Sequence, residues 1–171
     1  MKSKSKNLIA VVGADKIGKS SSIVNLFNTL SSMNNAVVVN RLYPKQGKIQ
    51  SDVVATVKLT IDNNKDILVG IISLGDVDKV VSGYIQQLMK AHCDTIIFAC
   101  HQNFMDNSKH TASFQSKGYN YITTSCLHNN YAPRLAISKT PSHMTNSIVS
   151  NVDLNSIFSQ NVIYLINQLY K

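Results

Sequence analysis

The segment Gly13–Ser20, which reads Gly-Ala-Asp-Lys-Ile-Gly-Lys-Ser, constrains the fold of this chain more than any other feature. It matches the pattern GxxxxGK[ST] at every fixed position. The apolar run Asn7–Val12 precedes it, and from Lys19 to Met33 apolar residues recur at helical spacing. The sequence therefore predicts a strand, a glycine-containing loop and a helix in direct succession.

Each fixed position of this loop has a chemical reason to bind phosphate. Gly13 and Gly18 allow backbone conformations in which successive N–H groups point at phosphate oxygens. The Lys19 ammonium is expected to reach the β- and γ-phosphates, and the Ser20 hydroxyl to ligate Mg²⁺. The residues expected to bind the nucleotide are Gly13, Ala14, Asp15, Lys16, Ile17, Gly18, Lys19, Ser20 and Ser21.

On this loop the chain resembles the P-loop NTPase superfamily, and the resemblance implies a parallel sheet with the nucleotide at its carboxyl edge. Two further segments, Ser73-Leu74-Gly75-Asp76 and Cys93-Asp94-Thr95-Ile96-Ile97, resemble small stand-alone bacterial or phage ATPases of unassigned role. This narrower resemblance implies no substrate.

The rest of the chain predicts one α/β domain over residues 1–171, with a basic tail at 1–6 and an irregular region at 126–150. The expected fold has three layers and a mostly parallel sheet with one antiparallel hairpin strand. That strand is Val53–Ile61, whose alternation of apolar and polar residues predicts a half-exposed edge strand. It pairs with Ile67–Leu74, and a kinase–GTPase-like order would put the strand before Asp76 beside the first strand.

Asp76 is the first candidate for the carboxylate that supports Mg²⁺, because it follows the apolar run 67–75 and so lies at the carboxyl edge. Its alternative role is to cap the helix that begins near Val77. Asp52 begins the antiparallel strand and is the second choice. Asp94 precedes its strand and falls at the wrong edge.

The missing residues also limit the function. The chain contains no glutamate, whereas AAA-type and ABC-type ATPases are expected to activate water with a glutamate beside the Asp76 position. The Asn-Lys-x-Asp motif of Ras-like GTPases is absent near 100–103. ATP is therefore favoured over GTP, with Mg²⁺ as the metal.

His101 and Gln102 follow the apolar strand Thr95–Cys100 and are, with Lys19, the expected catalytic residues. Either could orient an attacking water or sense the γ-phosphate, although a polar loop after a strand is also ordinary. Arg41 is an acceptor-site candidate for a kinase, and Arg134 is a candidate for its lid.

Three functions stay open on this basis: a slow Mg-ATPase that acts as a switch or accessory factor, a small-molecule or nucleotide kinase, and a nucleotide-sensing module without turnover. The net charge of +8 favours anionic partners, either nucleic acid or an acidic protein, although scattered lysines are also typical of a solvated surface. Three cysteines without paired spacing and no long apolar run predict a cytoplasmic protein without a membrane span. The oligomeric state stays open.

Overall fold

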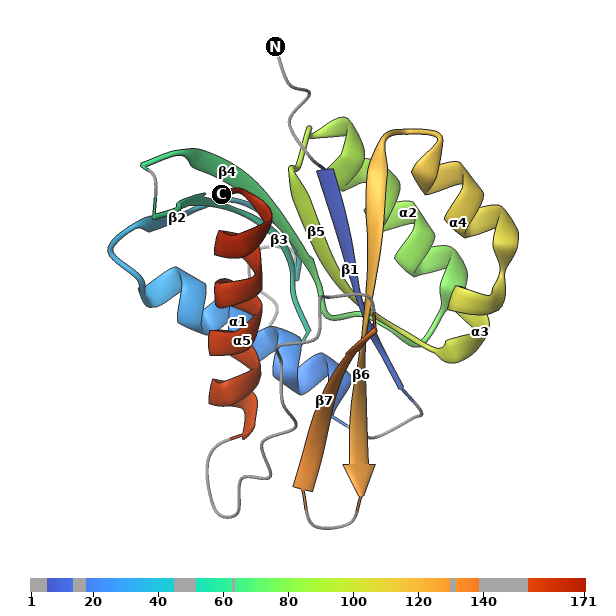
Figure 1. Ribbon diagram of the computed structural model, residues 1–171. Helices are drawn as coiled ribbons and strands as arrows, with labels where there is room; N and C mark the ends of the chain where they lie inside the picture. Colours follow the sequence, from blue (N-terminus) through green and yellow to red (C-terminus); the bar gives the residue numbers. More distant parts are fainter. Residues whose placement is uncertain (1–5, 14–17, 45–51, 63, 130–131, 139–153) are drawn as a thin grey trace.

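The computed structural model describes residues 6–13, 18–44, 52–62, 64–129, 132–138 and 154–171. Within these residues, seven strands form one sheet and five helices pack on it (Figure 1). None of the helices in this part of the chain is long and apolar enough to span a membrane.

The strands and helices follow the expected alternation. The strands are β1 (Lys6–Val12), β2 (Ala36–Tyr43), β3 (Val54–Thr60), β4 (Asp66–Ile72), β5 (Thr95–Cys100), β6 (Tyr119–Asn129) and β7 (Ala132–Ser138). The helices are α1 (Lys19–Ser32), α2 (Asp78–Lys90), α3 (Gln102–Asp106), α4 (Ser108–Gln115) and α5 (Leu154–Leu169). The strand predicted before the glycine-containing segment and the helix predicted after it are both present.

The sheet is mixed, with a parallel centre. Its strand order is β2-β3-β4-β5-β1-β6-β7. The central strands β4, β5, β1 and β6 are parallel, whereas β3 and β7 run antiparallel to their neighbours. The parallel strands therefore bring their carboxyl ends to the same edge of the sheet.

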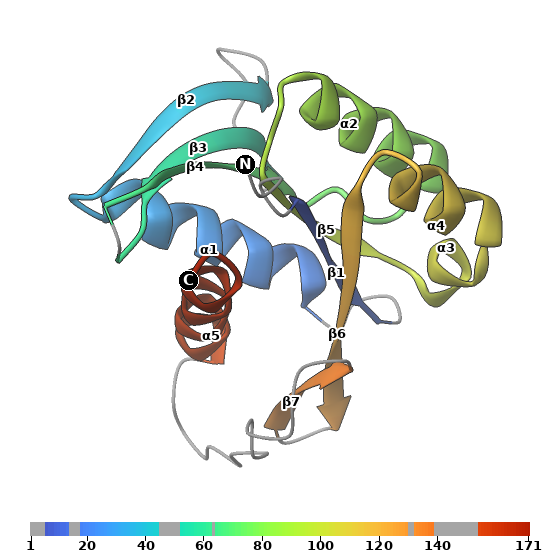
Figure 2. The ribbon, with the colours of Figure 1, turned by 45° about the horizontal axis from the view of Figure 1, so that its top comes forward.

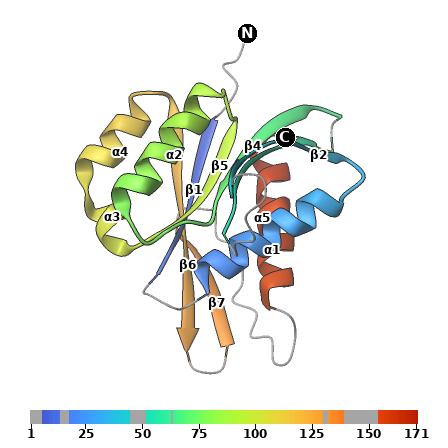
Figure 3. The same ribbon diagram turned by 180° about the vertical axis from the view of Figure 1, so that it is seen from behind.

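Helices cover both faces of this sheet. One apolar core lies under α1 and α5, and a second lies under α2, α3 and α4. Figure 2 shows the two groups of helices on opposite sides of the strands, and Figure 3 shows the same separation from behind. The α/β architecture with three layers agrees with the expectation from the sequence.

The prediction of an edge position for the third strand is wrong. β3 lies between β2 and β4, and the true edge strand is β2, on which Val37, Val38 and Val39 are exposed. The polar residues of β3 reflect partial exposure of one face of the sheet, since Lys58 is exposed but Thr56 is buried. The alternation of apolar and polar side chains indicates which face of a strand meets solvent. It does not indicate whether the strand lies at the edge of the sheet, because that depends on which strands pair through their backbones.

The expected kinase–GTPase-like order is also wrong, because β4 does not lie beside β1. β5 pairs with β1 on one side and with β4 on the other. The strands β1, β4 and β5 are all almost entirely buried and therefore have similar apolar compositions. Composition alone therefore cannot predict which of these strands lie next to each other.

The region 126–150 is not irregular throughout. β6 continues to Asn129 and β7 pairs with it antiparallel, which adds a second antiparallel strand to the expected one. β7 is an edge strand, where Pro133 is tolerated because no further strand needs its missing N–H. Residues 130–131 and 139–150 lie outside the described residues, as do 1–5 of the expected tail, whereas Lys6 is the first residue of β1.

A buried polar cluster ties the end of the chain to the centre of the sheet. The Tyr170 hydroxyl accepts a hydrogen bond from Asn7 Nδ2 at 3.2 Å and shares another with the Thr95 hydroxyl at 2.8 Å. Burial raises the pKa of Tyr170, and the hydrogen bonds to Thr95 and Asn7 oppose that rise. The cluster fixes the C-terminal end of α5 to β1 and β5.

We expect Tyr170→Phe to lower the free energy of unfolding by about 1–3 kcal/mol, because it leaves the buried polar groups of Asn7 and Thr95 without this partner. Urea unfolding followed by circular dichroism measures the change. Tyr164→Phe is the matched control, since Tyr164 lies on the same helix with 55% of its surface exposed. Equal effects from the two variants would contradict the role of the cluster.

Candidate functional site

At the junction between β1 and α1, the backbone adopts a conformation that favours glycine. Gly13 directly follows β1, and its N–H donates to the Cys100 carbonyl at the end of β5 over 3.3 Å. Gly18 has a φ of +89°, a left-handed conformation that side chains disfavour, and α1 begins at the next residue. The amino end of α1 therefore faces the carboxyl edge of the sheet, where a helix terminus attracts anions.

Lys19 is nearly buried at this junction, with only 4% of its surface exposed. Its ammonium group donates a hydrogen bond to the Gly13 carbonyl at 2.9 Å. The ammonium also lies within electrostatic reach of Cys100. Burial raises the pKa of the Cys100 thiol to about 12, and the Lys19 charge opposes that rise. A cation is thus held in the interior at the expected phosphate position.

Ser20 points toward the end of a different strand. Its hydroxyl donates to the Ser73 carbonyl, just after β4, at 2.8 Å. Ser21 is exposed on the first turn of α1. The remaining predicted contacts, Ala14, Asp15, Lys16 and Ile17, lie outside the described residues.

Asp76 lies at the carboxyl edge, as expected, but its side chain is 86% exposed. Its Oδ1 is 3.9 Å from Nε2 of His101, which follows β5. Asp76 does not cap α2, because the cap position is Val77 and no side chain caps that helix. The segment before Asp76 packs tightly on β5, since a Cβ on Gly75 would lie 2.7 Å from the Ala99 Cβ.

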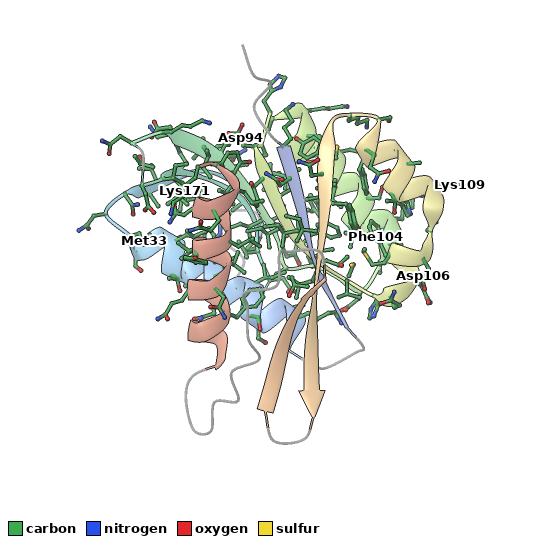
Figure 4. All side chains as sticks on the ribbon, viewed as in Figure 1. Met33, Asp94, Phe104, Asp106, Lys109 and Lys171 are labelled. Atoms are coloured by element: carbon green, nitrogen blue, oxygen red, sulfur yellow. The ribbon has the colours of Figure 1, made fainter. Side chains whose placement is uncertain are left out.

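The two candidate water-orienting residues differ in their surroundings. His101 is half-buried and faces Asp76. Gln102 is exposed, and its amide donates to Asp106 within α3 at 3.0 Å. Figure 4 labels Asp106 on this helix. His101 therefore lies near Asp76, whereas the Gln102 amide is hydrogen-bonded to Asp106.

Ser73 is the functional candidate that the sequence interpretation missed. It is fully buried, and its hydroxyl donates to Asp52 Oδ1 at 2.9 Å. Asp52 therefore lies at the carboxyl edge, as its place before the antiparallel strand predicts. Asp94 lies at the opposite edge, where its carboxylate accepts from the Leu68 N–H (Figure 4). A serine directly after an apolar strand was the available signal for Ser73.

The two arginines considered for a kinase lie on the two edge strands of the sheet. Arg41 is on the edge strand β2, separated from β1 by three strands, and its guanidinium sits 5.0 Å above the Phe27 ring. Arg134 is on β7 and pairs with Leu127. The hairpin of β6 and β7 reaches past the carboxyl end of β1, whose last residue, Val12, pairs with Ser125 (Figure 1).

The free cysteines Cys93 and Cys100 are both buried. Among the described residues, no group of three or more histidine, cysteine or acidic side chains is arranged to hold a metal ion. A metal at the carboxyl edge would therefore also depend on hydroxyl groups and water.

The described candidates that gather at the carboxyl edge are Gly13, Gly18, Lys19, Ser20, Asp52, Ser73, Asp76 and His101. Comparison of the chain with protein-family models, with curated protein sequences and with solved structures finds no match.

The packing of the Asp76 segment on β5 predicts that Gly75→Ala destabilises the protein. The new methyl group meets Ala99, which cannot move aside, so we expect the free energy of unfolding to fall by about 1–3 kcal/mol. Gly83→Ala is the control. Gly83 lies in α2 with open space around it, and a helical alanine should stabilise by about 0.5–1 kcal/mol. Urea unfolding of both variants checks the contrast, and a neutral Gly75→Ala would contradict the close packing.

Proposed function

We propose that this chain binds Mg-ATP at the β1–α1 junction and hydrolyses it slowly, as a switch or accessory factor. The observation that carries the proposal is the nearly buried Lys19 ammonium, which donates to the Gly13 carbonyl at the amino end of α1. Burial of an ammonium group is costly unless it is paired, and a charged phosphate oxygen stabilises an ammonium group more strongly than a neutral carbonyl does. A triphosphate is therefore the natural partner of this cation.

The positive groups around the junction suit a polyphosphate. The amino end of α1 begins at Lys19 and presents the N–H groups of its first turn toward the carboxyl edge. The left-handed Gly18 lets the chain enter the helix without a side-chain clash. These features favour a chain of negative oxygens over a neutral ligand. ATP is preferred to GTP because the Asn-Lys-x-Asp motif is absent.

The oxygen groups beside this junction fit Mg²⁺, which prefers hard oxygen ligands and keeps several waters. Ser20 offers a hydroxyl, and Asp52 and Asp76 offer carboxylates at the same edge. When bound, Mg²⁺ would neutralise part of the negative charge on the phosphate oxygens. These residues would hold the ion together with the nucleotide.

Hydrolysis needs a water placed in line with the terminal phosphorus. The water oxygen bonds to that phosphorus while the bond to the bridging oxygen breaks, ADP leaves with the electron pair of that bond, and one water proton passes to a phosphate oxygen or to solvent. His101 is the better candidate to orient this water, because the Gln102 amide is already bonded to Asp106. Lys19 balances the negative charge on the phosphates throughout.

A nucleotide-sensing module without turnover is the second candidate. The occupied Gln102 amide and the exposed Asp76 carboxylate favour it, since neither is directed by the surrounding structure toward a reacting phosphate. Such a module would share the binding site and differ only in the absence of phosphate release.

We expect the purified protein to release phosphate from ATP slowly in Mg²⁺ and to lose this activity in Lys19→Ala, because the variant removes the cation that contacts the phosphates. A phosphate-release assay with excess enzyme measures the rate, and nucleotide binding measured by calorimetry should weaken about tenfold or more in the same variant.

Lys79→Ala is the matched control, since Lys79 is an exposed lysine on α2. It should leave binding and turnover unchanged. Binding without any release in the unaltered protein would favour the sensing module, and equal binding by the unaltered protein and Lys19→Ala would refute the site.

A further inference from the structure

Ser73 connects three parts of the carboxyl edge through four hydrogen bonds. Its N–H donates to the Val53 carbonyl at 2.9 Å, and its hydroxyl oxygen accepts from the Val53 N–H at 2.8 Å. The hydroxyl proton is donated to Asp52 Oδ1 at 2.9 Å. The Ser73 carbonyl accepts from the Ser20 hydroxyl at 2.8 Å. One buried serine thus joins the start of β3 to the start of α1.

This arrangement links the Asp52 carboxylate to the Ser20 hydroxyl through Ser73. Because the Val53 N–H occupies the oxygen of the Ser73 hydroxyl, its proton is directed to Asp52. The other Asp52 oxygen makes no hydrogen bond with any described residue. Asp52 is half-buried, so this carboxylate is partly shielded from bulk water and yet open on one side.

Asp76 lacks these connections. Its side chain is 86% exposed, and the interaction that orients it is the 3.9 Å approach to His101 at the end of β5. Within the described residues, no hydrogen bond links it to Ser20 or to Ser73. An exposed carboxylate with one distant partner is poorly positioned to hold a metal-bound water.

We propose that Asp52, oriented by Ser73, is the carboxylate that supports Mg²⁺ beside Ser20, in place of Asp76. The inference rests on the proposed function, because it concerns the metal that accompanies the nucleotide. Asp52 would support the ion, and Ser73 acts as a positioning residue whose hydroxyl fixes the carboxylate. The carboxylate thus comes from the strand antiparallel to β4 and not from the segment that follows β4.

The test is an equilibrium titration of a fluorescent ATP analogue at increasing Mg²⁺, with one series in EDTA. Asp52→Asn should raise the Mg²⁺ concentration for half-maximal binding by about 10–100-fold. Asp76→Asn should stay within about twofold of the unaltered protein. The same ordering should hold when Mn²⁺ replaces Mg²⁺ and bound Mn²⁺ is counted from the loss of its free-ion electron paramagnetic resonance signal.

Two further variants separate the metal effect from misfolding and from general charge. Ser73→Ala should also raise the Mg²⁺ requirement, although it changes no charge, and Asp62→Asn removes an exposed carboxylate from the opposite edge and should have no effect. Asn at position 52 keeps an oxygen that can accept from Ser73, so circular dichroism should show a folded variant.

The outcomes distinguish this inference from the proposed function. Absence of nucleotide binding by the unaltered protein, with and without Mg²⁺, would refute the proposed function and the inference with it. Mg²⁺-dependent binding that is unchanged in Asp52→Asn and Ser73→Ala, but impaired in Asp76→Asn, would keep the proposed function and overturn only the inference.

Discussion

Parallel pairing of β1 with β5, and of β5 with β4, is the constraint on which the candidate site depends. It brings the carboxyl ends of these strands to one edge, so residues distant in the sequence meet there. Gly13 follows β1, Ser73 follows β4 and His101 follows β5. The antiparallel β3 adds Asp52, because its amino end lies where β4 finishes. A slip in any of these pairings would separate the groups.

The Lys19 ammonium links this architecture to the proposed chemistry. At the start of α1 the Lys19 residue is only 4% exposed, and its ammonium group donates a hydrogen bond to the Gly13 carbonyl. Such a cation gains from an anionic partner more than a solvated surface lysine does, because the low local dielectric strengthens the attraction. In the proposed function a triphosphate would be that anion, Ser20 and Asp52 would offer oxygen groups for its metal, and Ser73 connects those two residues.

Individual strands and helices of this fold were predictable from the sequence, but the order of the strands in the sheet was not. The strand at β1 and the helix at α1 follow from apolar spacing and from the loop between them. The place of β5 between β1 and β4 was missed, because buried parallel strands share one composition and backbone pairing leaves no trace in it. β7 was missed because Pro133 and the polar residues near it are typical of a loop. An edge strand nevertheless tolerates such residues.

The site was predictable to the same extent. The motif itself identifies Gly13, Lys19 and Ser20, and strand direction puts Asp52 and Asp76 at the correct edge. The link from Ser20 through Ser73 to Asp52 depends on side-chain hydrogen bonds between strands, which spacing along one chain cannot encode. The engagement of Gln102 with Asp106 is similarly a matter of local helix geometry.

The most direct test of nucleotide binding at the β1–α1 junction is a two-dimensional ¹H–¹⁵N NMR titration of the protein with Mg-ATP, alongside adenosine. We expect the amide signals of Gly13, Gly18 and Lys19 to shift most with Mg-ATP and hardly at all with adenosine, because phosphate contacts dominate there. Absence of shifts, or shifts confined to residues away from this junction, would contradict it.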